Sequence, residues 1–393
     1  MKRFIFTIAF LSSIMAAGAQ TSIEEVLRSV EANNKELQAN HQLVTARKIE
    51  ARLGNNLPDP SVSYTHQYGN KEGMGIQGEL VASQSFDFPS VYVQKNKLSQ
   101  AKGEGFDRQG AEVRQQILLQ AKEVCLDLIL LNQQKSLLDP RRQNAEQLSA
   151  LYATRLQNGD ANVLEVNKID LELLNAKNEA RMNEAARVAK LHELAMLNGG
   201  IAINFTDTVY LPVEAPQSFV DLKQEAVPAD RQLLSLQSEK AAALRQLSVS
   251  KSLNLPGFEL GYRLNTAAGG ERFNGFLVGI SIPLFSNRNN VKQAKAQSLY
   301  TDLQLESTTT TVENELLRLY NQSLALKTSI DEYSDVLKSQ NNLALLNKAI
   351  QAGQISMIEY FVDVTTLYQS MQNYMQLQNE YQKVMAQLYK YKL

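Results

Sequence analysis

The stretch FLVGISIPLF, residues 276–285, alternates bulky apolar side chains with small or polar ones. The bulky members are Phe276, Val278, Ile280, Ile282 and Leu284, and Gly279, Ser281 and Pro283 have the opposite parity. This alternation is typical of a β-strand whose one face meets an apolar medium while the other meets something different. The stretch therefore predicts a strand inside a chain whose other long segments are helical by pattern.

Composition and charge exclude several classes of protein. The chain has 393 residues, of which 44% are hydrophobic and 21% are charged, as expected for a folded protein. Lys and Arg number 40 against 41 Asp and Glu, so no net field attracts nucleic acid, and we expect no nucleic-acid partner. The single cysteine, Cys125, excludes an intrachain disulfide.

The first residues predict export. Lys2 and Arg3 precede an apolar run from Phe4 to Met15, and Ala17-Gly18-Ala19 follows it. This order is typical of a secretory signal peptide, which we place at residues 1–19. No later run is apolar over the roughly 18 residues that a membrane-spanning helix requires. We therefore expect an exported protein without a helical anchor.

Three short patterns recur in the same order in both halves of the chain. Asn56-Leu57-Pro58 returns as residues 254–256, and FDFPS at 86–90 returns as IPLFS at 282–286. Gly159 and Glu165 return as Gly353 and Glu359 with the same spacing. The recurrences predict an internal duplication with a first repeat at 20–200, a connector at 201–220 and a second repeat at 221–393.

Each repeat is expected to contain one helix, two strands, a very long helix, a glycine turn and a return helix. In the first repeat these elements are predicted at 23–53, 61–68, 76–88 and 91–157, with a return helix to about 198. In the second they are predicted at 222–253, 258–264, 276–284 and 287–352, with a return helix to about 391. The fold class is mainly α with a small β part.

The long helices indicate antiparallel coiled-coil hairpins. About 65 residues at roughly 1.5 Å each would reach on the order of 100 Å, which no compact core needs. An apolar stripe at three-four spacing supports the coiled coil. It consists of Leu316, Leu319, Ser323, Leu326, Ile330, Tyr333 and Leu337. Pro140 is expected to break or kink the first long helix, and the second has no matching proline.

The predicted strands suggest a membrane barrel. A closed barrel is the only sheet that crosses a bilayer with every backbone group paired, and four strands are too few to close one. Other copies of the chain would have to supply the remainder. Aromatic residues near strand ends fit an interfacial belt. They are Tyr64, Tyr68, Phe86, Phe88, Tyr262, Phe273 and Phe285. The alternative is a small soluble β-domain on a coiled-coil stalk.

The chain resembles the TolC-type outer-membrane efflux proteins of Gram-negative bacteria. The order of elements matches twice, and RLQNGDANVLEV (155–166) and AIQAGQISMIEYFVDV (349–364) look like the family's two periplasmic tip turns. The resemblance implies a homotrimer whose copies complete a 12-stranded barrel in outer-membrane lipid and continue it as a helical tunnel in the periplasm. It also implies a passive exit duct for small molecules or ions in a tripartite efflux or type I secretion system. Its partners would be a periplasmic membrane-fusion adaptor and an inner-membrane pump of the resistance-nodulation-division or ABC type.

The resemblance also nominates residues. Gly159, Asp160, Gly353 and Gln354 match the tips that contact the adaptor. Glu165 and Glu359 match acids beyond each turn, and Glu359 is the best candidate for a constriction ring. The family's second acid falls at Val362, and Asp363 is one residue off. Three like carboxylates around an axis repel and favour protonation. Alternatively, both glutamates are solvated first-turn acids that the helix dipole favours.

No catalytic, cofactor or metal site is expected. His41, His66 and His192 have no metal-ligand spacing, and no phosphate loop or nucleophile motif occurs. We therefore do not expect an enzyme. The alternative function is an exported coiled-coil scaffold or a periplasmic adaptor without a conducting pore.

Overall fold

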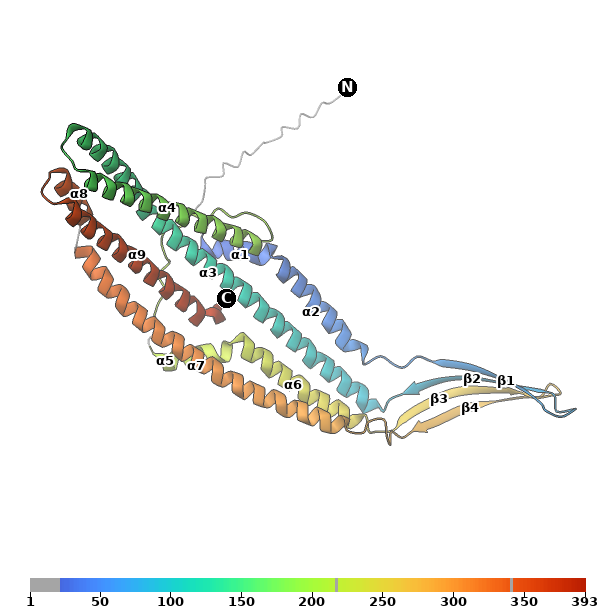
Figure 1. Ribbon diagram of the computed structural model, residues 1–393. Helices are drawn as coiled ribbons and strands as arrows, with labels where there is room; N and C mark the ends of the chain where they lie inside the picture. The colour runs from blue at the N-terminus through green and yellow to red at the C-terminus, as the bar shows by residue number, and fades with distance from the viewer. Residues whose placement is uncertain (1–21, 216–217, 340–341) are drawn as a thin grey trace, which may run out of the picture. The chain divides into compact units, whose positions relative to one another are not determined.

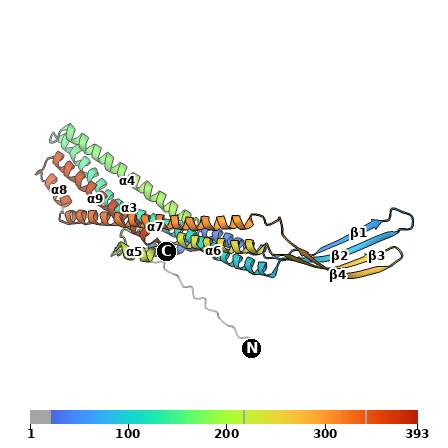
Figure 2. The same cartoon turned by 90° about the horizontal axis from the view of Figure 1, so that it is seen from below.

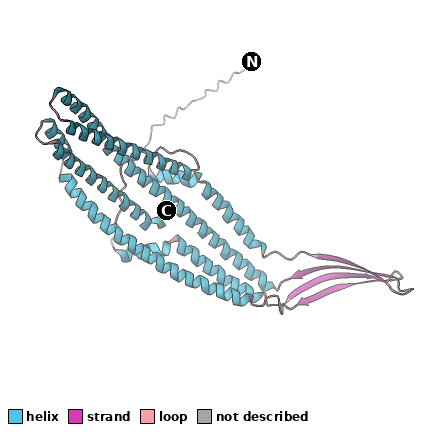
Figure 3. Cartoon of the chain, viewed as in Figure 1, coloured by secondary structure: helices cyan, strands magenta, loops and turns pink. Residues whose placement is uncertain are grey.

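The structure is a computed structural model that describes residues 22–215, 218–339 and 342–393. The predicted signal peptide, residues 1–19, lies outside the described residues. Helices dominate the described chain, and its strands form one four-stranded sheet (Figure 1, Figure 3). No helix in this described part is both long and apolar enough to cross a membrane.

The elements follow the predicted order, with differences in their bounds. The first half contains α1 (Ile23–Asn33), α2 (Lys35–Leu53), β1 (Ser61–Tyr68), β2 (Ile76–Phe86), α3 (Pro89–Asn158) and α4 (Val163–Leu197). The second half contains α5 (Phe219–Ala229), α6 (Arg231–Ser252), β3 (Gly257–Thr266), β4 (Arg272–Ser281), α7 (Asn290–Ser339), α8 (Asn342–Gln351), α9 (Met357–Leu388) and a final 3-10 turn, η1 (Lys390–Lys392). Residues 340–341, between α7 and α8, are not described.

Each of the two shorter predicted helices is in fact two helices. Asn34 separates α1 from α2, and Asp230 separates α5 from α6, both with extended backbone at ψ 123°. The Asn34 side chain accepts a hydrogen bond from the Leu37 amide, and Asp230 accepts one from the Leu233 amide. Each break therefore carries its own N-cap, which satisfies a backbone donor that a helix start leaves unpaired.

Helix α3 runs through Pro140 without interruption, so of the break or kink expected there, the break is wrong. Pro140 removes the amide that would bond the Ser136 carbonyl, but Pro140 itself is exposed. Leu138 and Arg141 on either side are buried. Water can satisfy the free carbonyl while packing of the neighbouring residues keeps the helix continuous.

The helices and the sheet group into two compact units, each with segments from both halves of the sequence. The described part of the first unit is 22–33, 121–212, 329–339 and 342–383. That of the second is 34–120, 213–215, 218–328 and 384–393. In the first unit, Asn132 and Gln133 of α3 donate hydrogen bonds to the carbonyls of Asp207 and Thr208 in the connector. In the second, an ion pair joins Lys48 of α2 to Asp107 of α3.

The four strands form one antiparallel sheet in the order β1-β2-β3-β4. They lie side by side in both orientations (Figure 1, Figure 2). Strand β4 ends at Ser281, three residues before the predicted end at Leu284. Pro283 explains the difference, because it has no amide to donate to a ladder and instead sits in a tight turn closed by the Leu284 amide and the Ile282 carbonyl.

Candidate functional site

The sheet has one apolar face and one polar face. Register pairs Tyr262 with Phe276 and with Ala82, which places these residues on the same face. The apolar face consists mainly of Val62, Tyr64, Tyr68, Ile76, Leu80, Ala82, Phe258, Leu260, Tyr262, Leu264, Phe276, Val278 and Ile280. Many of these side chains are exposed, with Phe276 at 93%, Val278 at 74% and Ile280 at 66%. Much of this face is therefore left uncovered by the residues that the structure describes.

Ser, Thr, Gln, Glu, Arg and Gly dominate the opposite face. Its members include Ser61, Ser63, Thr65, Gln67, Gln77, Glu79, Ser83, Ser85, Gly257, Glu259, Gly261, Arg263, Asn265, Gly275, Gly279 and Ser281, with Val81, Phe273 and Leu277 as apolar exceptions. Arg263 and Glu79 form an ion pair at 2.9 Å on this face, and the Ser61 and Ser83 hydroxyls are 2.9 Å apart. Charge and hydroxyl groups on this face suit contact with water.

Both edges of the sheet lack a neighbouring strand among the described residues. The strand order leaves β1 and β4 at the edges. An edge presents a row of free N–H and C=O groups that can pair with another chain. The sheet can therefore be extended from both sides, which is what a sheet shared between copies of one chain requires.

The two tip turns end their long helices with the same hydrogen bonds. In the first, the Gly159 amide donates to the Leu156 carbonyl and the Asp160 amide to the Arg155 carbonyl. In the second, Gly353 and Gln354 donate in the same way to Ile350 and Ala349. This pattern is a Schellman motif, which needs a left-handed residue. The glycine φ angles are 80° at Gly159 and 69° at Gly353.

Each return helix then begins with a capping box. In α4 the Asn162 side chain accepts from the Glu165 amide at 3.0 Å, and the Glu165 carboxylate accepts from the Asn162 amide at 3.0 Å. In α9 the Ser356 hydroxyl accepts from the Glu359 amide at 3.2 Å, and the Glu359 carboxylate accepts from the Ser356 amide at 2.9 Å. Hydrogen bonds from Ser356, the backbone amide first, lower the pKa of Glu359.

The nominated residues all lie at or just beyond these turns. Gly159, Asp160, Gly353 and Gln354 are exposed, as an external contact requires. Glu165 and Glu359 hold caps within their own helices, which is the contact that the first-turn alternative expects. Asp363 is exposed on α9, one helical turn after Glu359. Among the described residues of one chain, these carboxylates do not gather into one cluster.

A buried core behind the turns was not predicted from the sequence. It joins Leu148 and Tyr152 of α3 and Ile169 of α4 to side chains of α8 and α9. Members from the last two helices and the turn are Ile350, Met357, Tyr360, Val364 and Tyr368. Tyr360 is 1% exposed; its hydroxyl accepts from the Asn144 amide and donates to the Asn347 side-chain oxygen, both at 2.7 Å.

Arg141 of α3 links this helix to α4 and α9. Its guanidinium bonds Glu172 at 2.8 Å and Glu179 at 2.7 Å on α4, and lies 5.0 Å from the Tyr368 ring centre on α9. Burial raises the pKa of Tyr368 to about 12, with Arg141 opposing the rise. The only sequence signal near Arg141 was Pro140, which predicted an effect on the helix backbone and not a role for the Arg141 side chain.

No metal site is apparent in the described parts of the chain. Within residues 22–215, 218–339 and 342–393, no group of three or more His, Cys, Asp or Glu side chains is arranged to hold an ion. Cys125 is buried, and burial, with a smaller effect of Asp207, raises the pKa of its thiol to about 12. A thiol held neutral in this way is a poor nucleophile.

Comparison with known proteins supports the predicted resemblance. Residues 222–391 match the family model for the outer membrane efflux protein. No curated protein sequence matches the chain. Solved structures share its fold over 94% of its length. CusC is 16% identical in sequence, is covered over 91% of its own chain and gives a TM-score of 0.77. VceC from Vibrio cholerae is 13% identical, is covered over 95% of its chain and gives a TM-score of 0.76. The open state of the MtrE channel from Neisseria gonorrhoeae is 13% identical, is covered over 88% of its chain and gives a TM-score of 0.74. The predicted fold class, long helices with four strands per chain, is confirmed.

Proposed function

We propose that the protein is an outer-membrane exit duct, because residues 222–391 match the family model for the outer membrane efflux protein and the chain shares the fold of the solved structures of CusC and VceC. Three copies contribute four strands each to one closed barrel in the outer membrane of a Gram-negative bacterium. Their helices continue it as a tunnel in the periplasm. Small molecules or ions pass through without chemical change, and the duct performs no catalysis.

The two-faced sheet with open edges is the observation that carries this proposal. An apolar face of this size, left exposed by its own chain, needs an apolar environment. Lipid supplies it on the outside of a barrel, while the polar face lines a water-filled interior. Pairing β4 of one copy with β1 of the next satisfies every edge group, which a bilayer demands. A soluble β-domain would instead have to hide the apolar face.

We propose that the tip turns dock a periplasmic membrane-fusion adaptor. The Schellman hydrogen bonds hold Gly159, Asp160, Gly353 and Gln354 in fixed, exposed conformations, so a partner can bind them without a large ordering cost. An inner-membrane pump of the resistance-nodulation-division or ABC type supplies the energy through this adaptor. The substrate follows from the pump, because a wide tunnel makes few specific contacts.

Fractionation of cells that express the protein tests the duct. We expect it in the outer membrane, extracted only by detergent, and running in gels as a trimer that dissociates on heating. Recovery as a water-soluble monomer would favour the scaffold or adaptor alternative instead. Purified trimers in a planar bilayer should also conduct ions, whereas a scaffold should leave the bilayer sealed.

We propose Glu359 as the constriction residue, with Glu165 and Asp363 as further candidates. Its exposure and its position as the third residue of α9, six residues after Gly353, support this role. Two variants separate charge from capping. Glu359→Gln keeps an oxygen for the Ser356 amide but removes the charge, whereas Ser356→Ala weakens the cap and keeps the charge. Glu359→Gln alone should lower cation selectivity of the conductance; an equal change in both variants would show that Glu359 acts only as a cap.

We also propose that the chain arose by duplication, with repeats at 20–200 and 221–393. The matched turns and capping boxes support this, as do the extended breaks at Asn34 and Asp230. Exchanging the two tip segments, 155–166 and 349–360, tests it structurally. If the turns are equivalent, the exchanged protein should fold and reach the membrane as well as the original.

A further inference from the structure

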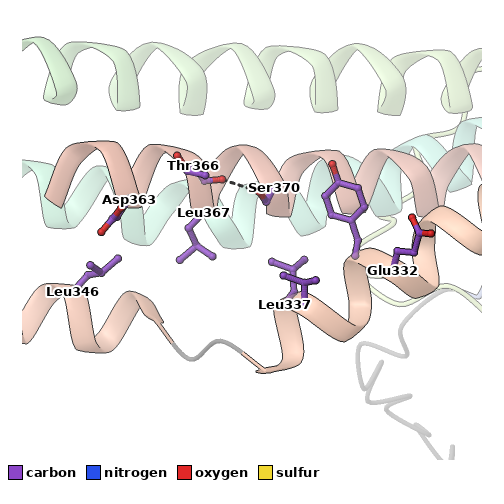
Figure 4. A pocket seen from close by; sticks show the side chains of 9 residues that line it. Glu332, Leu337, Leu346, Asp363, Thr366, Leu367 and Ser370 are labelled. Carbon is purple, nitrogen blue, oxygen red and sulfur yellow. Dashed lines mark hydrogen bonds between the residues drawn. The ribbon is translucent and has the colours of Figure 1, made fainter. Parts of the chain in front are cut away.

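A cavity of about 450 Å³ lies between α7, α8 and α9, within the first compact unit. Its size is in the range of small-molecule sites. Figure 4 shows Asp363 beside Leu346 at one end and Glu332 at the other, with Leu337 and Leu367 between them. The cavity therefore has an apolar middle and a carboxylate at each end.

The cavity lies where α9 turns most of its apolar side chains toward α3 and α4 and away from α7. Along α7 the stripe is buried from Leu316 to Ile330, but the next members, Tyr333 and Leu337, are only half-buried. On α9, Val364 and Tyr368 pack into the buried core with α3 and α4, and only Leu367 adds an apolar side chain of this helix to the cavity. The coiled-coil seam opens at this level, and apolar surface on α7 is left without a close partner.

Apart from the Tyr333 hydroxyl, the polar groups that line the cavity act as acceptors of hydrogen bonds. The Thr366 hydroxyl donates to the Val362 carbonyl at 2.7 Å, and the Ser370 hydroxyl donates to the Thr366 carbonyl at 2.8 Å. Only their lone pairs remain for a ligand. The carboxylates of Glu332 and Asp363 form no ion pair with another described residue, and the lining contains no Lys or Arg. The cavity therefore offers negative charge and mainly hydrogen-bond acceptors. A ligand that fits it should be a cation that donates hydrogen bonds.

We propose that this cavity binds an amphipathic organic diamine, with an apolar middle and a protonated amine at each end. The hydrocarbon part covers Leu337, Leu346 and Leu367, while the two ammonium groups pair with Glu332 and Asp363. Charge-assisted hydrogen bonds of this kind are stronger than neutral ones, so the carboxylates select the cation. The inference uses only contacts within one chain and does not depend on the proposed duct.

The test measures binding of 1,10-diaminodecane to the detergent-solubilised, full-length mature protein by isothermal titration calorimetry. We expect saturable binding that weakens about fivefold in Glu332→Gln and in Asp363→Asn, and further in the double variant. Asp335→Asn is the matched control, since Asp335 is an exposed acid on α7 that does not line the cavity. It should bind within about twofold of the original.

Two further measurements separate a built site from general attraction. The neutral 1,10-decanediol enters micelles as well, and should bind the protein at least about tenfold more weakly than the diamine if charge selects. Leu337→Phe keeps both carboxylates but fills the cavity, and should also weaken binding, with circular dichroism confirming the fold. No saturable binding, equal binding of the diol, or an equal loss in Asp335→Asn would each overturn the proposal.

Discussion

Gly159 and Gly353 show how one residue decides a long helix's end. A Cβ at either position would meet nothing within 4 Å, so space does not require glycine there. Their positive φ angles do, because a side chain in the left-handed region contacts the following carbonyl. The requirement is therefore a property of the backbone, and the recurrence of glycine in the sequence was sufficient to reveal it.

Gly353→Ala and Gly159→Ala should each destabilise their turn by about 1–2 kcal/mol. Amide exchange of residues near the turn measures the loss as roughly a tenfold fall in protection, since about 1.4 kcal/mol corresponds to a factor of ten. Gly54→Ala is the matched control, because Gly54 has an ordinary φ of −66° and equally open surroundings. Equal loss at Gly54 would show that the φ argument is wrong.

Glu359 is expected to titrate below the ordinary glutamate pKa, owing to hydrogen bonds from Ser356. A lowered folded-state pKa contributes stability that is present above the ordinary value of about 4.3 and is lost as pH falls through the lowered value. Carboxyl-carbon NMR, assigned with Glu359→Gln, measures this pKa, and Ser356→Ala should move it upward. A raised value in the trimer would instead show that carboxylates of neighbouring copies approach closely enough to outweigh the cap.

At the scale of elements, packing overrides local preference in α3. Proline within a helix costs about 3 kcal/mol relative to alanine, yet α3 continues through Pro140 because the surrounding residues are held by contacts. Arg141 illustrates this, with two glutamates of α4 and the Tyr368 ring around its guanidinium. Local propensity alone therefore predicted a break that the tertiary contacts prevent.

Pro140→Ala should stabilise this part of α3, by up to about 3 kcal/mol. Pro140 is exposed, so the change removes no buried contact and restores an amide for the Ser136 carbonyl. Amide exchange of residues just after Ser136 should slow. Unchanged or faster exchange would mean that the helix around Pro140 depends on the proline itself.

The sheet faces predict opposite effects at adjacent positions of β4. Phe276→Lys places a charge on the face assigned to lipid, at a cost of about 2–4 kcal/mol near the bilayer middle. Leu277→Lys places the same charge on the polar face and should be tolerated. The amount of heat-sensitive trimer in the membrane fraction measures the difference between the two variants. Equal amounts from both would contradict the assignment of this face to lipid.

At the scale of the whole molecule, the chain's open edges predict assembly. Cysteine at Ser63 of β1, combined in turn with cysteine at Gly275, Leu277 or Gly279 of β4, should give reducible trimers in at least one pair. Ser63→Cys alone is the control, and the native Cys125 is buried with a raised pKa, so it should not interfere. A failure of every pair to cross-link would argue against direct β1 to β4 pairing between copies.

The sequence by itself determined the elements that depend on local periodicity or a special residue. Strand β1 has its predicted bounds, the other strands differ by a few residues, and both tip turns lie at the predicted glycines. The candidate site residues at the turns came from the family resemblance instead, and their roles stay predictions. These features follow from side-chain alternation and backbone conformation, which act between residues close in the chain.

Only the tertiary structure decided which helices stay continuous and what the acids do. The breaks at Asn34 and Asp230, the continuity through Pro140, and the links of Tyr360 and Arg141 join residues far apart in sequence. The cavity beside Tyr333 and Leu337 likewise arises because α9 spends its apolar side on α3 and α4. Each of these features depends on which face a neighbouring helix presents. The sequence of one segment does not show which of its neighbours will bury its apolar side chains.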